Sequence, residues 1–495
     1  MERREFLQQC AGFAGTVLLG TTIASLQETQ GQGDSKARSS RPNIVLFFVD
    51  DLGWRDVGFM GSTYYETPHI DRLAAEGMVF TQAYANAANC APSRASLMSG
   101  QYTPRHGIYT VGTSARGNAR DHRLIPIENM ETLPTEKVTI AEVLAAVGYV
   151  SASMGKWHLG DPPSHGPKAQ GFDVNVGGYG AGNPKGGYFS PYNNPYLADG
   201  PEGEYLTDRL TEEAVAFIKA NRERPFFLYL THYAVHTPIQ AKEEMVGRYR
   251  DKKPEGRHDN PKYAAMVESV DESVQAVCET LDSLVLSANT VVIFFSDNGG
   301  YGGVTGMEPL RGSKGMFYEG GIREPMIVRW TGVTRPGSRC EMPVIGVDFL
   351  PTLAEIAQAP LPAEQVLDGV SLVGLLRGGT SLDRESLYWH FPAYLQGNLP
   401  GSRDKKFRTR PVSVIRKGDW KLLLYHEEWV LDGGWEKRET NHAVELYDLG
   451  HDLSEATDLA TQRPEKRDEL LKDLLAWIET THAPIPTQAN EAYRG

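Results

Sequence analysis

The sequence predicts an α/β protein in which a large, mixed but mostly parallel sheet is sandwiched by helices, followed by a smaller C-terminal subdomain of antiparallel strands and a helix. Two observations lead to this prediction. Short, nearly continuous apolar runs alternate with amphipathic helical patterns along most of the chain, as expected for a parallel sheet covered on both faces. The composition is also globular, with 40% hydrophobic and 23% charged residues among 495.

Five apolar runs are predicted to be buried parallel strands, because they lack the polar alternation of a half-exposed strand. They cover residues 43–49, 149–154, 225–230, 290–295 and 326–330. Amphipathic patterns predict helices between them, over residues 139–146, 206–221 and 263–284. These elements predict one main α/β domain over residues 42–380.

The C-terminal region has a different pattern, with shorter and more closely spaced apolar runs. Antiparallel strands are predicted at residues 412–415, 420–425 and 443–449, and a closing amphipathic helix at residues 464–479. We therefore expect a separate α+β subdomain over residues 381–495.

The first thirty residues have the features of a twin-arginine export signal. Residues 3–7 fit the pattern R-R-x-F-L, and the uncharged stretch that follows is only weakly apolar because it is rich in glycine and threonine. Residues 1–30 are interpreted as a signal peptide and residues 31–41 as a polar linker. This predicts a periplasmic or extracellular protein without stable membrane insertion after processing, with a retained N-terminal anchor as the alternative.

Charge and cysteine content argue against several classes of protein. A formal net charge of −13 is unfavourable for DNA or RNA binding, which depends on a basic face, so no nucleic-acid partner is expected. Four cysteines in this length cannot form a disulfide scaffold, and none is spaced as a zinc-binding pair. For Cys278 and Cys340, one disulfide and two free thiols both remain open.

Polar side chains follow four of the predicted strands. They are Asp50 and Asp51, Lys156 and His158, His232 and His236, and Asp297 and Asn298. Because ligands of open α/β sheets bind beyond the carboxyl ends of the strands, we expect an active site at this edge. The acids and the amide offer only oxygen ligands, which suits a hard cation of the Ca²⁺ type. Helix capping or turn formation is the alternative role of the acids.

Residues 90–100, with the sequence CAPSRASLMSG, are the most informative segment. Pro92 suits the first turn of a helix, which places Cys90 at the helix N-terminus, where free N–H groups favour an anionic ligand. A buried cysteine before a helix is the alternative. The pattern C-x-P-S-R, with apolar residues and Gly100 downstream, resembles the signature of the type I sulfatases. In that family this cysteine is oxidised to Cα-formylglycine (3-oxoalanine).

The resemblance extends over most of the chain and implies the alkaline phosphatase-like fold. Further matching segments are VDDLGW around Asp50, GKWHLG at 155–160, H-T-P at 236–238, D-N-G at 297–299, the glycine-rich segment 310–323, and the stretches 415–422 and 445–449. The sequence departs from the family at Glu324, where a small apolar residue is more common. We expect this departure to lie outside the chemistry.

The resemblance also implies a set of ligands and catalytic residues. One Ca²⁺ per chain is expected, with the ligands Asp50, Asp51, Cys90, Asp297 and Asn298. The implied catalytic residues are Cys90, Arg94, Lys156, His158, His236 and Lys314. A formylglycine-generating maturation enzyme is implied as a partner.

Each catalytic residue has an implied role in the family's reaction. The hydrated formylglycine at position 90 attacks sulfur, and a sulfo-enzyme intermediate then releases inorganic sulfate. Arg94 holds the hydrated group, while Lys156 and Lys314 bind sulfate oxygens. His236 or Lys314 protonates the leaving alcohol, and His158 is the base that restores the aldehyde.

The predicted function is therefore that of an exported sulfatase acting on a sulfated small molecule or glycan, with carbohydrate favoured. The alternative is a phosphomonoester, phosphodiester or phosphonate ester hydrolase of the same superfamily. A binding protein with unmodified Cys90 is disfavoured because the lysines and histidines of the motifs are intact. Neither the sugar nor the oligomeric state follows from the sequence.

Substrate choice is assigned to the loops at residues 177–194 and 391–410. The second loop contains the basic run 403–410, which either contacts a second sulfate or carboxylate at the cleft rim or is a solvated loop. His106 is expected to support the nucleophile segment. For His232, a place in the site and a place in the core both remain open.

Overall fold

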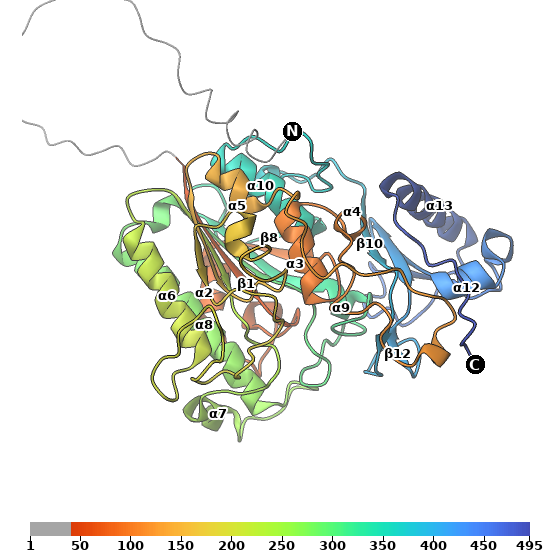
Figure 1. The fold of residues 1–495 in the computed structure, drawn as a ribbon, viewed down its shortest axis with the longest axis horizontal. Helices are drawn as coiled ribbons and strands as arrows, with labels where there is room; N and C mark the ends of the chain where they lie inside the picture. The colour runs from red at the N-terminus through yellow and green to blue at the C-terminus, as the bar shows by residue number, and fades with distance from the viewer. Residues whose placement is uncertain (1–40) are drawn as a thin grey trace, which may run out of the picture.

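The computed structural model describes residues 41–495, so the predicted signal peptide and nearly all of the linker lie outside the described residues. A nine-stranded sheet forms the centre of the larger part of the molecule (Figure 1). Its strand order is β4-β3-β5-β1-β6-β7-β2-β8, with β9 paired to β2. The strands are β1 (Asn43–Val49), β2 (Met78–Tyr84), β3 (Val150–Gly155), β4 (Val174–Val176), β5 (Phe226–Thr231), β6 (Thr290–Ser296), β7 (Arg323–Trp330), β8 (Ser338–Cys340) and β9 (Val344–Ile345).

The sheet is mixed but mostly parallel, as predicted. Strands β4, β3, β5, β1 and β6 are each parallel to their neighbours in this row. Strand β7 is antiparallel to both β6 and β2. The prediction of a parallel strand at residues 326–330 is therefore wrong in direction, and the strand begins earlier, at Arg323. A continuous apolar run indicates burial on both faces but contains no information on direction.

Helices cover both faces of this sheet (Figure 1). Alternate residues of β1 contribute to two cores, Val45 and Phe47 to one and Ile44 and Leu46 to the other. Helices α2, α6 and α8 pack in the first core, and α3, α5 and α10 in the second. The helices of this part are α2 (Pro68–Glu76), α3 (Cys90–Ser99), α4 (Thr103–His106), α5 (Ile140–Ala145), α6 (Leu206–Ala220), α7 (Glu243–Tyr249), α8 (Pro261–Ser283), α9 (Glu319–Ile322), α10 (Phe349–Ala357) and α11 (Val373–Leu376).

A second sheet forms the C-terminal part, shown in blue in Figure 1. It is antiparallel, with the order β10-β13-β14-β15, and consists of β10 (Ser386–Phe391), β13 (Val412–Lys417), β14 (Trp420–Tyr425) and β15 (Val444–Asp448). Its further elements are the short pair β11 (Leu395–Gln396) and β12 (Phe407–Thr409), and the helices α12 (His426–Leu431) and α13 (Pro464–Thr481). Leucines of α13 pack on β13 and β14. Among helices in residues 41–495, none is both long and apolar enough to cross a membrane.

A buried ion cluster connects the two sheets. The Nζ atom of Lys421, on β14, lies 2.9 Å from Glu319 at the start of α9 and 2.8 Å from Glu455, and all three side chains are fully buried. The hydroxyl of Tyr84, from β2, donates a hydrogen bond to Glu319. This cluster therefore fixes α9, which lies within the glycine-rich segment 310–323, against the C-terminal sheet.

We expect the substitution Lys421→Met to lower the free energy of unfolding by about 3–5 kcal/mol, because it leaves two buried carboxylates without their shared cation. Urea denaturation followed by circular dichroism measures this change. The matched control is Lys405→Met, which removes an exposed lysine and should alter stability by less than about 0.5 kcal/mol. Equal effects of the two substitutions would contradict the assigned role of Lys421.

Candidate active site

The carboxyl ends of four adjacent parallel strands bring the predicted polar side chains together. Asp50 and Asp51 follow β1, Asp297 and Asn298 follow β6, and the amide of Asn298 donates a hydrogen bond of 2.8 Å to Asp51. Asp51 adopts a left-handed backbone conformation, with φ of 59°, which aspartate tolerates better than most residues. The turn after β1 thus directs two carboxylates to the end of β6.

The end of β3 is shaped by a glycine. At Gly155, φ is +105°, and a β-carbon there would lie 2.0 Å from the carbonyl oxygen of Thr231 on β5. Only glycine therefore allows β3 and β5 to stay this close while the chain turns into Lys156. The backbone N–H of Lys156 then donates to that same carbonyl, at 2.7 Å.

Three cations, of which Lys156 and Arg94 are fully buried, pair with the three acids. Lys156 Nζ lies 2.6 Å from Asp50 Oδ2, Arg94 Nη2 lies 2.7 Å from Asp297 Oδ2, and Lys314 Nζ lies 2.6 Å from Asp51 Oδ1. Arg94 extends from α3 and Lys314 from the glycine-rich segment. Residues from five distant parts of the chain thus form one charged centre.

The electrostatics differ between the two neighbouring aspartates. Burial raises the pKa of Asp50 well above its usual range, outweighing the opposing effect of Lys156. Burial also acts to raise the pKa of Asp51, but the charge of Lys314, with further contributions from neighbouring cations, holds this pKa below its usual range. Asp51 is therefore the more firmly ionised member of the pair.

Unpartnered oxygens indicate room for a cation. Asp50 Oδ1 and Asn298 Oδ1 are buried and have no hydrogen-bond partner among the described residues. Ligand atoms of Asp50, Cys90 and Asp297 lie within 4.8 Å of one another, as do those of Asp50, Asp51 and His236. A donor set dominated by carboxylate and amide oxygens fits a hard cation such as Ca²⁺.

Cys90 is the first residue of α3 and is 2% exposed. Burial raises the pKa of its thiol, so the unmodified side chain is a neutral thiol and a poor nucleophile at neutral pH. The imidazole Nε2 of His106, on α4, lies 2.9 Å from the hydroxyl of Ser96, which belongs to α3 like Cys90. His106 thus packs behind α3, in agreement with its predicted supporting place.

The two histidines after β5 have different surroundings. Burial, with the charge of Lys314, lowers the pKa of His236 to about 3, and His236 Nε2 lies 3.7 Å from Asp51. His232 is fully buried, and its Nε2 lies 2.8 Å from the hydroxyl of Ser273 on α8. The structure therefore places His236 at the charged centre and His232 in the core beside α8.

A cavity of about 240 Å³ gives access to this centre. Cys90, His158, His236 and Lys314 line it. Burial, with the neighbouring cations, holds the pKa of His158 well below its usual value, so this imidazole is neutral. The rest of the lining is Asn89, Val111, Arg116, Gly182, Asn183, Leu395 and Arg408. Both loops predicted to govern substrate choice therefore contribute to the cavity.

The sequence did not indicate two features of this region. Arg116 belongs to no motif, yet it lines the cavity. Glu324, on β7, is fully buried, and neither carboxylate oxygen has a hydrogen-bond partner among residues 41–495. Burial raises its pKa well above the usual range, and the nearby charges of Asp297 and Asp51 add to this effect. A neutral carboxylic acid is therefore the favoured form of Glu324.

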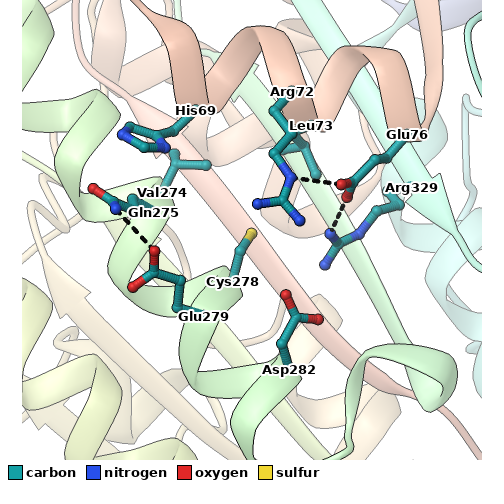
Figure 2. Close-up of a pocket in the computed structure, with 10 residues that line it drawn as sticks. All are labelled: His69, Arg72, Leu73, Glu76, Val274, Gln275, Cys278, Glu279, Asp282 and Arg329. Carbon is teal, nitrogen blue, oxygen red and sulfur yellow. Dashed lines mark hydrogen bonds and ion pairs between the residues drawn. The ribbon is translucent and has the colours of Figure 1, made fainter.

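Cys278 and Cys340 are both free thiols in the structure. Figure 2 shows Cys278 in a small pocket between α2 and α8. Three of the charged side chains there form ion pairs, Glu76 with Arg72 at 2.7 Å and with Arg329 at 2.8 Å. This pocket lies apart from the cavity that contains Cys90, and the two share no lining residue.

Comparison with known proteins gives matches to sulfatases over most of the chain. The family profile described as Sulfatase matches residues 42–359, and the one described as N-sulphoglucosamine sulphohydrolase, C-terminal, matches residues 312–482. A sulfatase of Formosa agariphila is 34% identical, over 95% of this chain and 94% of that protein. An N-acetylgalactosamine-6-sulfatase of Mus musculus is 34% identical, over 90% of this chain and 87% of that protein.

Solved structures agree with these matches. The structure of Ps i-CgsB in complex with k-i-k-neocarrahexaose has a TM-score of 0.72 and 30% identity, and the match covers 91% of this chain and 95% of that chain. A putative sulfatase from Bacteroides fragilis shares the fold, with a TM-score of 0.70 at 20% identity over 95% of this chain and 100% of that chain. The chain therefore belongs to the sulfatase family, within the alkaline phosphatase superfamily, and is a sulfuric ester hydrolase.

Proposed function

We propose that this sulfatase is exported and hydrolyses a sulfate monoester on a carbohydrate, using a formylglycine formed from Cys90 and one Ca²⁺ beside it. The observation that carries this proposal is the convergence of Cys90, Lys314, His158 and His236 on one cavity. Two of these lining residues, Cys90 and His236, lie within 4.8 Å of carboxylate oxygens that suit a hard cation.

The metal would be held by Asp50, Asp51, Asp297, Asn298 and residue 90. When bound, Ca²⁺ supplies positive charge that offsets the negative charge of the sulfate oxygens. The buried and unpartnered oxygens of Asp50 and Asn298 support this ligand set. Arg94, paired with Asp297, holds that carboxylate in place.

The cations of the site would bind and orient the sulfate group. Lys156 and Lys314 are positioned by Asp50 and Asp51, and each ammonium group has three N–H donors, so it can donate to a sulfate oxygen as well. Arg94 also donates to the backbone carbonyl of Lys156, at 2.9 Å. This hydrogen bond holds the backbone from which Lys156 extends.

Proton transfer is assigned to the neutral histidines and Lys314. His158 has a depressed pKa, so it is free to accept a proton as the base that restores the aldehyde. His236 and Lys314 are the candidates for protonating the leaving alcohol. The pKa of His236 should rise when a sulfate ester enters, because a nearby negative charge favours the imidazolium form.

A pair of glutamine substitutions tests this assignment. We expect His236→Gln to lower kcat/KM for a sulfated sugar such as N-acetylgalactosamine 6-sulfate by at least about a hundredfold, since its alkoxide leaving group needs a proton donor. We expect His232→Gln to change kcat/KM by less than about threefold, because glutamine can keep a hydrogen bond to Ser273. Comparable losses in both variants, measured by steady-state kinetics, would contradict the separation of the two histidines.

The carbohydrate substrate and the export rest on different observations. Relatives of this chain include an N-acetylgalactosamine-6-sulfatase, and a solved relative binds k-i-k-neocarrahexaose. Export is supported by the twin-arginine pattern in residues 1–30 and would place the enzyme in the periplasm or outside the cell. A maturation enzyme that installs formylglycine is required as a partner.

The proposal is tested on matured enzyme by comparing sulfate, phosphate and phosphonate esters of the same leaving group, and by measuring metal dependence. Nitrophenyl sulfate should be hydrolysed with a higher kcat/KM than nitrophenyl phosphate or the nitrophenyl ester of phenylphosphonate. A chelator should abolish hydrolysis, and added Ca²⁺ should restore it. A preference for the phosphorus esters would favour the alternative of a phosphoester or phosphonate hydrolase, and full activity in chelator would contradict the metal assignment.

A further inference from the structure

The cavity contains two arginines that the proposed chemistry does not use. Arg116 and Arg408 line it together with Cys90 and Lys314. Neither guanidinium forms an ion pair with an acidic residue within the described part of the chain; Arg116 donates to the backbone carbonyl of Val111, and Arg408 donates to that of Lys314, at 3.3 Å. Arg408 Nε is buried and has no hydrogen-bond partner there. Two cations thus face one cavity, and neither forms an ion pair with a carboxylate of the described residues.

The other basic residues of the same loop either form ion pairs with acidic residues or are exposed to solvent. Arg403 pairs with Glu428 and Glu445, and Lys406 lies 2.6 Å from Asp121. Arg410 pairs with Asp404 and Glu427. Lys405 is exposed to solvent. Within the basic run 403–410, Arg408 is therefore the residue whose side chain is directed into the cavity.

Electrostatic effects distinguish Arg116 and Arg408 from their paired neighbours. Burial lowers the pKa of both guanidiniums, and the charge of Arg116 adds to the lowering at Arg408. Acidic partners instead hold the pKa of Arg403 and Arg410 above the ordinary value despite burial. Two partly desolvated like charges that repel each other are stabilised when an anion binds between them.

The absence of a side chain at Gly315 leaves room for the side chain of Arg408. A β-carbon at Gly315 would lie 2.5 Å from Cδ of Arg408, and φ at Gly315 is +88°. The side chain of Arg408 therefore lies directly over the backbone that follows Lys314. This contact places the guanidinium beside the site proposed for the scissile sulfate.

We propose that Arg116 and Arg408 bind a second anionic group of the substrate, a carboxylate or a further sulfate, beside the sulfate that is hydrolysed. The proposal rests on the proposed function and narrows its substrate to glycans with two neighbouring anionic groups. Arginine suits this role because its planar fork donates two parallel hydrogen bonds to the oxygens of a carboxylate or sulfate.

Matched substrates test this inference on the matured, metal-loaded enzyme. N-acetylglucosamine 6-sulfate carries the scissile group as its only charge, glucosamine 2-N,6-O-disulfate adds a sulfate, and N-acetylglucosamine 6-sulfate linked to glucuronate adds a carboxylate. N-acetylgalactosamine 6-sulfate and its 4,6-disulfate form a second pair. We expect a higher kcat/KM for doubly charged members. If the added sulfate raises kcat/KM, the second group bound is a sulfate; if the added glucuronate raises it, the second group bound is a carboxylate.

Variants then assign the preference to the two arginines. In Arg116→Met and Arg408→Met, the ratio of kcat/KM for doubly over singly charged substrate should fall by about tenfold or more, the effect of losing a charge-assisted hydrogen bond. Arg408→Lys should retain part of the preference for the doubly charged substrate, because lysine keeps the positive charge at position 408. Lys405→Met, which removes a cation from the same loop outside the cavity, should leave all rates unchanged.

Two results would overturn the anion subsite alone. One is hydrolysis of nitrophenyl sulfate with no preference for any doubly charged sugar. The other is a preference that both methionine variants keep within about twofold, while thermal unfolding shows that they are folded. Failure of the matured enzyme to hydrolyse any sulfate ester would instead contradict the proposed function, and the subsite with it.

Discussion

The substitution Cys90→Ala should lower kcat for sulfate-ester hydrolysis by at least about a thousandfold, because alanine cannot be oxidised to the aldehyde that we propose as the source of the nucleophile. The other proposed metal ligands, which follow β1 and β6, remain, so Ca²⁺ binding should weaken only by the loss of one ligand. The fold should persist, since Cys90 opens a helix whose ten residues are all buried and the change removes a single sulfur atom. Single-turnover and steady-state kinetics, with a thermal melt of each protein, measure these effects.

Two further cysteine variants make this result specific. Cys90→Ser keeps the size of the side chain and a single hydroxyl, but it lacks the second hydroxyl that would expel sulfate from the enzyme, so turnover should stop after sulfation. Cys278→Ser changes a thiol in the separate pocket of Figure 2 and should leave kcat unchanged. Sustained turnover by Cys90→Ala would contradict the nucleophile assignment.

The substitution Asp297→Ala should impair metal binding, catalysis and stability together. Asp297 contributes to the oxygen cluster around Cys90 and pairs with Arg94, and both side chains of this pair are fully buried. We expect Ca²⁺ affinity and kcat/KM each to fall by at least about a hundredfold. The free energy of unfolding should fall by about 3–5 kcal/mol, because a buried guanidinium loses its carboxylate.

A neutral isostere separates these effects. Asp297→Asn keeps an oxygen that can accept from Arg94 but removes the negative charge, so it should lose less stability than the alanine variant while still binding Ca²⁺ weakly. Calorimetric titration with Ca²⁺ and urea denaturation measure the two quantities. Unchanged Ca²⁺ affinity in Asp297→Ala would exclude Asp297 as a metal ligand.

The residues at the strand ends could be predicted because their placement follows from topology. Parallel strands carry the residues after them to one edge, so Asp50 after β1 and Asp297 after β6 had to lie near each other. The direction of β7 could not be predicted in this way, since its apolar run is compatible with either direction. Strand β2 was missed because Thr81 and Gln82 interrupt its apolar pattern and are only half-buried.

The arginines that line the cavity were predicted less well than the polar residues at the strand ends. Arg116 lies in a polar loop with no periodic signal, and it reaches the site because Ala115 pairs with Tyr394, almost three hundred residues away. The basic run 403–410 was recognised, but which of its cations is free depends on acids such as Asp121 and Glu427 that pairing brings from elsewhere. Such non-local pairings leave no local sequence pattern.

The central claim is that residue 90 is matured to formylglycine, and peptide mass spectrometry on protein from its native source tests this most directly. We expect the peptide spanning residues 90–100 to have a mass about 18 Da below that of the unmodified cysteine peptide. That result would establish the aldehyde at the start of α3. Unmodified cysteine throughout, in protein that hydrolyses sulfate esters, would contradict the account.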